Sequence, residues 1–108
     1  MDRITLRNYE LADTILARAV GIMFRKRIGK PMLFVFPASG RVSIHSFFCP
    51  RFDAVFLDDR KNVTELYENI GPGHLITPKR KAAYLVEFPP NTASRRGIHR
   101  GTIIKFGR

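Results

Sequence analysis

The pattern of hydrophobic and polar residues along the chain predicts short strands. Residues 3–7 alternate between apolar and polar side chains, and residues 9–12 either continue this strand or pair with it. Residues 32–36, Met-Leu-Phe-Val-Phe, are an unbroken apolar run, which indicates a strand buried on both faces. Further strands are expected over 42–48, 54–57, 63–70, 82–88 and 102–106.

One helix is expected over residues 14–23. Asp13 and Thr14 are good N-cap residues, and the apolar side chains that follow share one helical face, namely Ile15, Leu16, Ala19, Val20 and Met23. We expect this face to pack on the sheet. Turns are expected at 37–40 and 58–62, and a long loop over 71–81.

These elements predict an α+β, mostly β fold over residues 1–108, which we interpret as a single domain. We expect about six or seven short, mainly antiparallel strands in a barrel-like arrangement, with one short helix. The chain has 108 residues, of which 44% are hydrophobic and nine are phenylalanine, so a core can form without disulfides.

Cysteine usage and hydropathy favour a cytoplasmic protein that does not enter a membrane. Cys49 is the single cysteine, which excludes an internal disulfide and a cysteine-based metal cluster. No apolar run reaches the ~18 residues that a membrane-spanning helix needs. The first ten residues do not resemble a signal peptide.

Net charge is the strongest compositional signal. Nineteen Lys and Arg oppose nine Asp and Glu, which gives +10 and attracts polyanions such as nucleic acid. The basic residues form three clusters: Arg25, Lys26 and Arg27; Lys79, Arg80 and Lys81; and Arg95, Arg96 and Arg100. Nearby aromatic residues could stack on bases if exposed, but the usual burial of phenylalanine favours core aromatics beneath a solvated basic surface.

Known catalytic and cofactor motifs are missing from the sequence. His45, His74 and His99 lack metal-ligand spacing, and the glycines at 71 and 73 are not followed by the Lys-Ser/Thr of a phosphate-binding loop. We therefore expect no metal and no cofactor. On a straight strand, His45 and Cys49 would lie about 13 Å apart, too far for a nucleophile pair.

The candidate binding site consists of Arg25, His45, Phe47 and Asp53. Asp53 precedes an apolar strand, and we expect it to be partly buried and paired with an arginine. If His45 and Arg25 converge, with Asp53 as the orienting acid and Phe47 as an apolar wall, they would recognise an anion or a carboxyl group. The alternative is a surface histidine and a solvated arginine.

Five segments, in this order, resemble one known family. They are Arg-Ala-Val-Gly-Ile-Met-Phe-Arg at 18–25, Met-Leu-Phe-Val-Phe at 32–36, Ile-His-Ser-Phe-Phe at 44–48, Phe-Asp-Ala-Val-Phe-Leu-Asp at 52–58 and Ala-Ala-Tyr-Leu-Val-Glu-Phe-Pro at 82–89. The pattern is similar to domain of unknown function 192, also called uncharacterised protein family 0127, and to its archaeal members. The resemblance implies a compact β-rich domain and no established reaction. Ser46, Cys49, Pro90, Asn91 and Thr102 depart from the family pattern.

Three functions therefore remain open. The first is a non-catalytic binding or accessory protein with an unknown partner, which could be a small molecule such as an anionic ligand, a protein or a polyanion. The second is a nucleic-acid-binding protein that uses the basic clusters. The third is an enzyme with a site around His45 and Asp53.

Overall fold

The structure is a computed structural model, which describes residues 2–12 and 21–107. In this part of the chain the elements are β1 (Arg3–Leu6), β2 (Glu10–Ala12), β3 (Met32–Gly40), β4 (Ile44–His45), β5 (Phe52–Leu57), β6 (Val63–Ile70), β7 (Leu75–Ile76), β8 (Ala82–Phe88), α2 (Thr92–Arg96) and β9 (Ile103–Phe106). The predicted α+β, mostly β class is confirmed.

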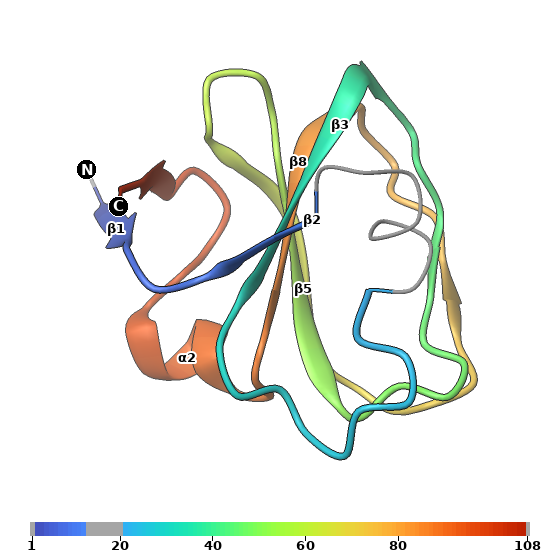
Figure 1. The fold of residues 1–108 in the computed structure, drawn as a ribbon. Helices are drawn as coiled ribbons and strands as arrows, with labels where there is room; N and C mark the ends of the chain where they lie inside the picture. Colours follow the sequence, from blue (N-terminus) through green and yellow to red (C-terminus); the bar gives the residue numbers. More distant parts are fainter. Residues whose placement is uncertain (1, 13–20, 108) are drawn as a thin grey trace.

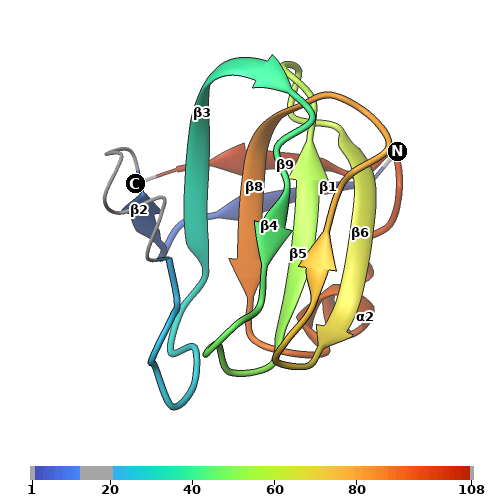
Figure 2. The same cartoon turned by 90° about the vertical axis from the view of Figure 1, so that its right-hand side faces the viewer.

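The strands form three layers. A central sheet has the order β2-β3-β8-β5-β6, in which β2 runs parallel to β3 and the other neighbours are antiparallel. The antiparallel pair β4–β7 lies over one face, and the parallel pair β1–β9 lies over the other together with α2. Figure 2 shows β4 and β7 in front of the central sheet and β1, β9 and α2 behind it. Figure 1 shows the same layers edge-on.

The sheet does not close into the expected barrel. Strands β2 and β6 are its two edges and do not pair with each other. The expected strand over 42–48 is also shorter, because the carbonyl of Ser46 accepts the Cys49 N–H at 3.2 Å and Phe48 has a φ of 59°. This turn ends β4 at His45. Strand β7, which pairs with β4, lies in the segment predicted as a long loop.

The helical predictions need two corrections. Residues 13–20 of the helix expected over 14–23 lie outside the described part of the chain, and residues 21–23 belong to a turn. The short helix α2 instead lies between the strands expected over 82–88 and 102–106, where no helix was expected. Gly97 ends it with a φ of 68°, and its N–H bonds to the carbonyls of Ala93 and Ser94. A glycine in this position is a recognisable helix C-terminus signal.

The central sheet is buried on both faces along β5, whose side chains alternate between two cores. Phe52, Ala54 and Phe56 join one core, and Val55 and Leu57 join the other. The predicted burial of the 32–36 run is confirmed for Leu33 and Phe34 but is wrong for Val35 and Phe36, which are half-buried. Strand β2 pairs with β3 from Met32 to Phe34, and no other described residue pairs with the end of β3 on that edge.

Asp53 is fully buried on β5, and its partners are backbone amides rather than the expected arginine. Its Oδ1 accepts the N–H groups of Asn69 at 2.7 Å and Asn91 at 3.1 Å, and its Oδ2 accepts the N–H of Ala93 at 2.9 Å. One carboxylate therefore joins the end of β6, the segment after β8 and the first turn of α2. Hydrogen bonds to an ionised acceptor are among the stronger ones in proteins.

Replacing Asp53 with asparagine is expected to destabilise the fold by about 2–3 kcal/mol, because the new NH₂ group faces an N–H donor and the charge is lost. Urea unfolding measures the change. Asp59→Asn is the control, because Asp59 is exposed just after the same strand and should change stability by less than about 0.5 kcal/mol. Equal effects of the two substitutions would contradict the role given to Asp53.

Candidate ligand-binding pocket

A pocket of about 500 Å³ lies between the central sheet and the β4 layer. Its size is within the range of small-molecule sites in proteins. Strands β3 and β8 supply Phe34 and Leu85, the turn after residue 20 supplies Ile22, and β4 supplies Ile44 and His45. Most of the wall is apolar, so the pocket favours a ligand with a hydrophobic body.

Glu87 on β8 is the acidic residue of this pocket. It is 5% exposed, and no group in the described part of the chain hydrogen-bonds to its Oε1. Burial raises the pKa of Glu87 to about 8, although the positive charge of Arg25 works in the opposite direction. The carboxyl is therefore mostly protonated at neutral pH, and it then carries an O–H that can donate a hydrogen bond.

Arg25 does not line the pocket. Its guanidinium binds the Glu10 carboxylate on β2 with two hydrogen bonds, from Nη1 to Oε2 at 2.5 Å and from Nη2 to Oε1 at 3.1 Å. The hydrogen bond from Arg25 lowers the pKa of Glu10 despite partial desolvation. Arg25 thus has a carboxylate partner and reaches Glu87 only through its electric field.

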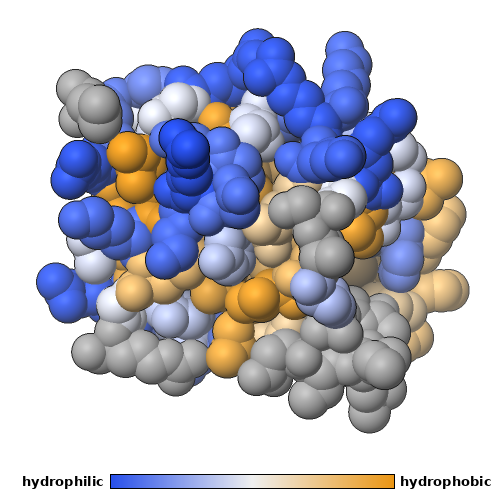
Figure 3. Space-filling model, turned by 90° about the horizontal axis from the view of Figure 1, so that it is seen from above, coloured by the Kyte–Doolittle hydropathy of each residue, from blue (hydrophilic) through white to orange (hydrophobic). Residues whose placement is uncertain are grey.

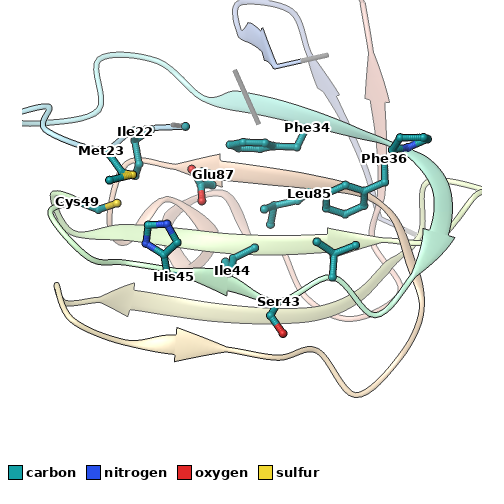
Figure 4. A pocket seen from close by; sticks show the side chains of 13 residues that line it. Ile22, Met23, Phe34, Phe36, Ser43, Ile44, His45, Cys49, Leu85 and Glu87 are labelled. Atoms are coloured by element: carbon teal, nitrogen blue, oxygen red, sulfur yellow. The ribbon is translucent and has the colours of Figure 1, made fainter. Parts of the chain in front are cut away.

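His45 does line the pocket, as expected for a binding residue. Its Nδ1 accepts the backbone N–H of Phe47 at 3.2 Å, and its ring stacks on that of Phe47 with centroids 5.5 Å apart. A neutral ring that accepts at Nδ1 carries its hydrogen on Nε2. Figure 4 shows His45 on the wall that faces Glu87.

Exposed aromatic side chains lie next to pocket-lining residues. Phe24 follows Met23 and Phe48 precedes Cys49, and the two phenylalanine rings stack with centroids 5.3 Å apart. They are 74% and 68% exposed, and the Phe24 N–H bonds to the Phe48 carbonyl at 2.7 Å. In Figure 3 hydrophilic residues dominate the upper part of the visible face, and hydrophobic residues show in several places, including its right-hand edge.

Cys49 belongs to the pocket wall, and no described residue around it lowers the pKa of its thiol. It is buried, and its Sγ donates to the Phe47 carbonyl at 3.4 Å. Burial, and to a lesser degree the charge of Glu87, raise the pKa of the Cys49 thiol to about 11. A thiol with a raised pKa is a poor nucleophile at neutral pH.

Asp53 and the pocket lie on opposite faces of the central sheet. In the pairing of β5 with β8, Asp53 is opposite Phe88, and Ala54 is opposite Glu87. Phe88 belongs to the core on the far side, whereas Ala54 belongs to the core beside the pocket. Of the candidate site residues, the structure therefore brings His45 into the pocket, places Phe47 against His45, and separates Asp53 from both.

Two of the three basic clusters contribute to one shallow groove. Lys79, Arg80 and Arg100 line a space of about 290 Å³ over β6, together with Glu65 and Tyr67. The Glu65 carboxylate accepts the backbone N–H groups of Lys79 and Arg80 at 2.9 Å each. Of the remaining members of the clusters, Arg25 is half-buried and the others are exposed, namely Lys26, Arg27, Lys81, Arg95 and Arg96.

Among residues 2–12 and 21–107, no group of three His, Cys, Asp or Glu side chains is placed to hold a metal ion. His99 instead pairs with Asp2, and it also bonds to the Arg100 carbonyl. No helix in this part of the chain is long and apolar enough to cross a membrane.

The described residues define a three-layer, mostly β protein with a largely apolar cavity, to which they contribute the buried carboxyl group of Glu87. The chain belongs to the DUF192 family, described as "Uncharacterized ACR", whose model matches residues 2–106. The resemblance inferred from its sequence segments is confirmed.

The similar proteins include several from archaea. The chain is 33% identical to UPF0127 protein TK1120 of Thermococcus kodakarensis over 90% of this chain and 63% of that protein. It is 30% identical to a UPF0127 protein of Thermococcus gammatolerans and spans 65% of its length. It is 32% identical to UPF0127 protein PF1050 of Pyrococcus furiosus over 90% of this chain and 84% of that protein.

Two solved structures share the fold. A candidate transcription regulator from Sinorhizobium meliloti has a TM-score of 0.81 and 26% identity, over 86% of this chain and 76% of that one. A protein of unknown function from Novosphingobium aromaticivorans has a TM-score of 0.80 and 23% identity, over 86% of this chain and 70% of that one.

The burial of Glu87 predicts a pH-dependent stability. The folded-state pKa of about 8 lies above the ordinary value of 4.5, so the folded protein keeps a proton that the unfolded chain releases. This group's contribution to stability is full below its ordinary pKa and is lost as pH rises through about 8. Between these limits it should fall by about 1.4 kcal/mol per pH unit.

Urea unfolding of the native protein and of Glu87→Gln, from about pH 5 to about pH 8, measures this slope. The difference in unfolding free energy between the two proteins isolates Glu87 from other titrating groups. A difference that stays constant over this range would show that Glu87 is ionised in the folded protein.

Proposed function

We propose that this chain is a non-catalytic binding protein that takes a small, largely apolar molecule into the pocket between the central sheet and β4. The observation that carries this proposal is a cavity of about 500 Å³ whose described walls are mostly apolar and include a buried acid, Glu87. Apolar cavities of this size that contain few polar groups are typical of ligand sites.

The arrangement of side chains favours binding over catalysis. The thiol of Cys49 has a raised pKa, and Asp53 lies on the other face of the sheet from His45. The residue pair of the enzyme hypothesis therefore does not converge. The stacked pair Phe24 and Phe48 leaves hydrophobic surface beside the pocket residues Met23 and Cys49. Such surface could guide an apolar ligand towards the cavity.

Filling the pocket tests this proposal. The probe is N-phenyl-1-naphthylamine, an uncharged dye that fluoresces in apolar sites. Ile44→Trp adds an indole to a half-buried pocket residue and should weaken dye binding by about tenfold or more. Leu75→Trp is the control, because Leu75 is 69% exposed on the paired strand β7 and should leave binding unchanged. Absence of dye binding, or equal effects of both substitutions, would contradict the proposal.

A second candidate function is binding of a polyanion. The observation that favours it is the meeting of Lys79, Arg80 and Arg100 at one groove, which also contains the half-buried Tyr67. Basic side chains around an aromatic residue are common where single-stranded nucleic acid binds.

Salt dependence tests this second function with an oligothymidylate as the probe. Replacing Lys79, Arg80 and Arg100 with glutamine should reduce the slope of log affinity against log salt by about 2, because three phosphate contacts are lost. The control replaces three exposed or partly exposed basic residues elsewhere, Lys26, Arg27 and Lys30. A slope near zero for the native protein, or the same change in both variants, would count against this groove.

A further inference from the structure

Glu87 leaves a buried polar atom without a hydrogen bond in the described part of the pocket wall. Its Oε1 is buried and has no partner in the described part of the chain. An unpartnered buried polar group is costly, and native proteins rarely keep one without a reason. Figure 4 shows the Glu87 carboxyl between Ile22 and Leu85, directed into the space that His45 faces from β4.

Of the other polar side chains in the described pocket wall, Ser43 and Cys49 have partners, and His45 is bonded through Nδ1 alone. The Ser43 hydroxyl bonds to Thr77 at 2.8 Å, the Cys49 thiol bonds to the Phe47 carbonyl, and His45 accepts the Phe47 N–H. A ligand that satisfies the buried Oε1 of Glu87 therefore needs a polar atom opposite Glu87, and the mostly apolar wall favours hydrophobic groups elsewhere.

The charges around Glu87 disfavour a charged ligand. A cation would lose its hydration beside the field of Arg25, in a chain of net charge +10. An anion would find no lysine or arginine among the described residues of the pocket wall, and Arg25 is already paired with Glu10. The acid Glu87 itself is protonated at neutral pH, so it acts as a donor.

We propose that the pocket selects uncharged molecules that place a hydrogen-bond acceptor, such as an amide or ketone oxygen, against the O–H of Glu87. This inference rests on the proposed function and defines its ligand class. Because the acceptor needs the protonated acid, binding weakens when Glu87 ionises. Arg25 and Cys49 are coupled electrostatically to Glu87, Glu10 pairs with Arg25, and His45 faces the same space.

Three probes of similar shape distinguish the ligand classes. They are 3-phenylpropanamide, 3-phenylpropylamine and 3-phenylpropanoate, which carry an uncharged acceptor, a cation and an anion. Isothermal titration calorimetry or ligand-observed NMR measures their affinities for the native protein. The amide should bind most tightly at pH 7, and its affinity should fall about tenfold at pH 9, in proportion to the fraction of protonated Glu87.

Two variants locate the effect at Glu87. Glu87→Gln keeps an NH₂ donor, so amide binding should persist and lose the tenfold change with pH. Glu87→Leu removes the donor, so amide binding should weaken while N-phenyl-1-naphthylamine still binds. Retained dye binding also shows that this variant is folded. If Glu87 had a purely structural role, Glu87→Gln would not remove the pH dependence of amide binding.

The inference is overturned if the amide does not bind, if its affinity is independent of pH, or if the amine or the carboxylate binds more tightly. In each of these cases, the proposed binding function would still stand if the native protein binds N-phenyl-1-naphthylamine and Ile44→Trp weakens that binding. If the dye does not bind, or if Ile44→Trp does not weaken its binding, the proposed binding function itself is overturned. Failure of the ligand class and failure of the binding function therefore give different results.

Discussion

Strand β8 is paired on both edges and buried on both faces, and this constraint determines the environment of the acids in the central sheet. It lies between β3 and β5, with Leu85 and Glu87 towards the pocket and Val86 and Phe88 towards the other core. A charged residue on such a strand has no route to solvent. It needs a partner inside the protein, a proton, or a ligand.

Two acids on neighbouring strands show two of these solutions. Asp53 accepts three backbone N–H groups and fastens α2 and the end of β6 to β5. Glu87 has an oxygen without a partner among the described residues and a pKa raised to about 8. The first acid stabilises the fold as a charged group, and the second is suited to stay neutral beside a cavity. The paired register places them on opposite sides of the sheet.

The strands with the clearest sequence patterns could be predicted, whereas the pairing of distant segments could not. The segments 63–70 and 82–88 match β6 and β8, because their patterns persist over several residues. Strand β7 has two residues and exists only because β4 pairs with it, so it leaves almost no pattern of its own. The barrel expectation failed because edge pairing depends on how distant strands meet, which periodicity does not encode.

The candidate site was partly predictable for the same reason. His45 was identified from the strand on which it lies. Asp53 was wrongly assigned to the same site, because the sequence indicates that an acid is buried but not which face of the sheet it lies on. Glu87 carried a usable signal, since it is the one charged residue within the apolar strand 82–88. Its importance depends on the register that sets it opposite Ala54 and beside the pocket core.

The net charge of +10 and the chemistry of the pocket act at different ranges. Exposed charges more than about 8 Å apart are largely screened at physiological salt, so the overall field governs encounter with polyanions. No lysine or arginine lines the described part of the pocket, Arg25 outside it is bound to Glu10, and most of the wall is apolar. A basic composition therefore does not imply an anionic ligand for this cavity. Arg25 is paired with Glu10, and the polar group that the described wall offers to a ligand is the uncharged carboxyl of Glu87.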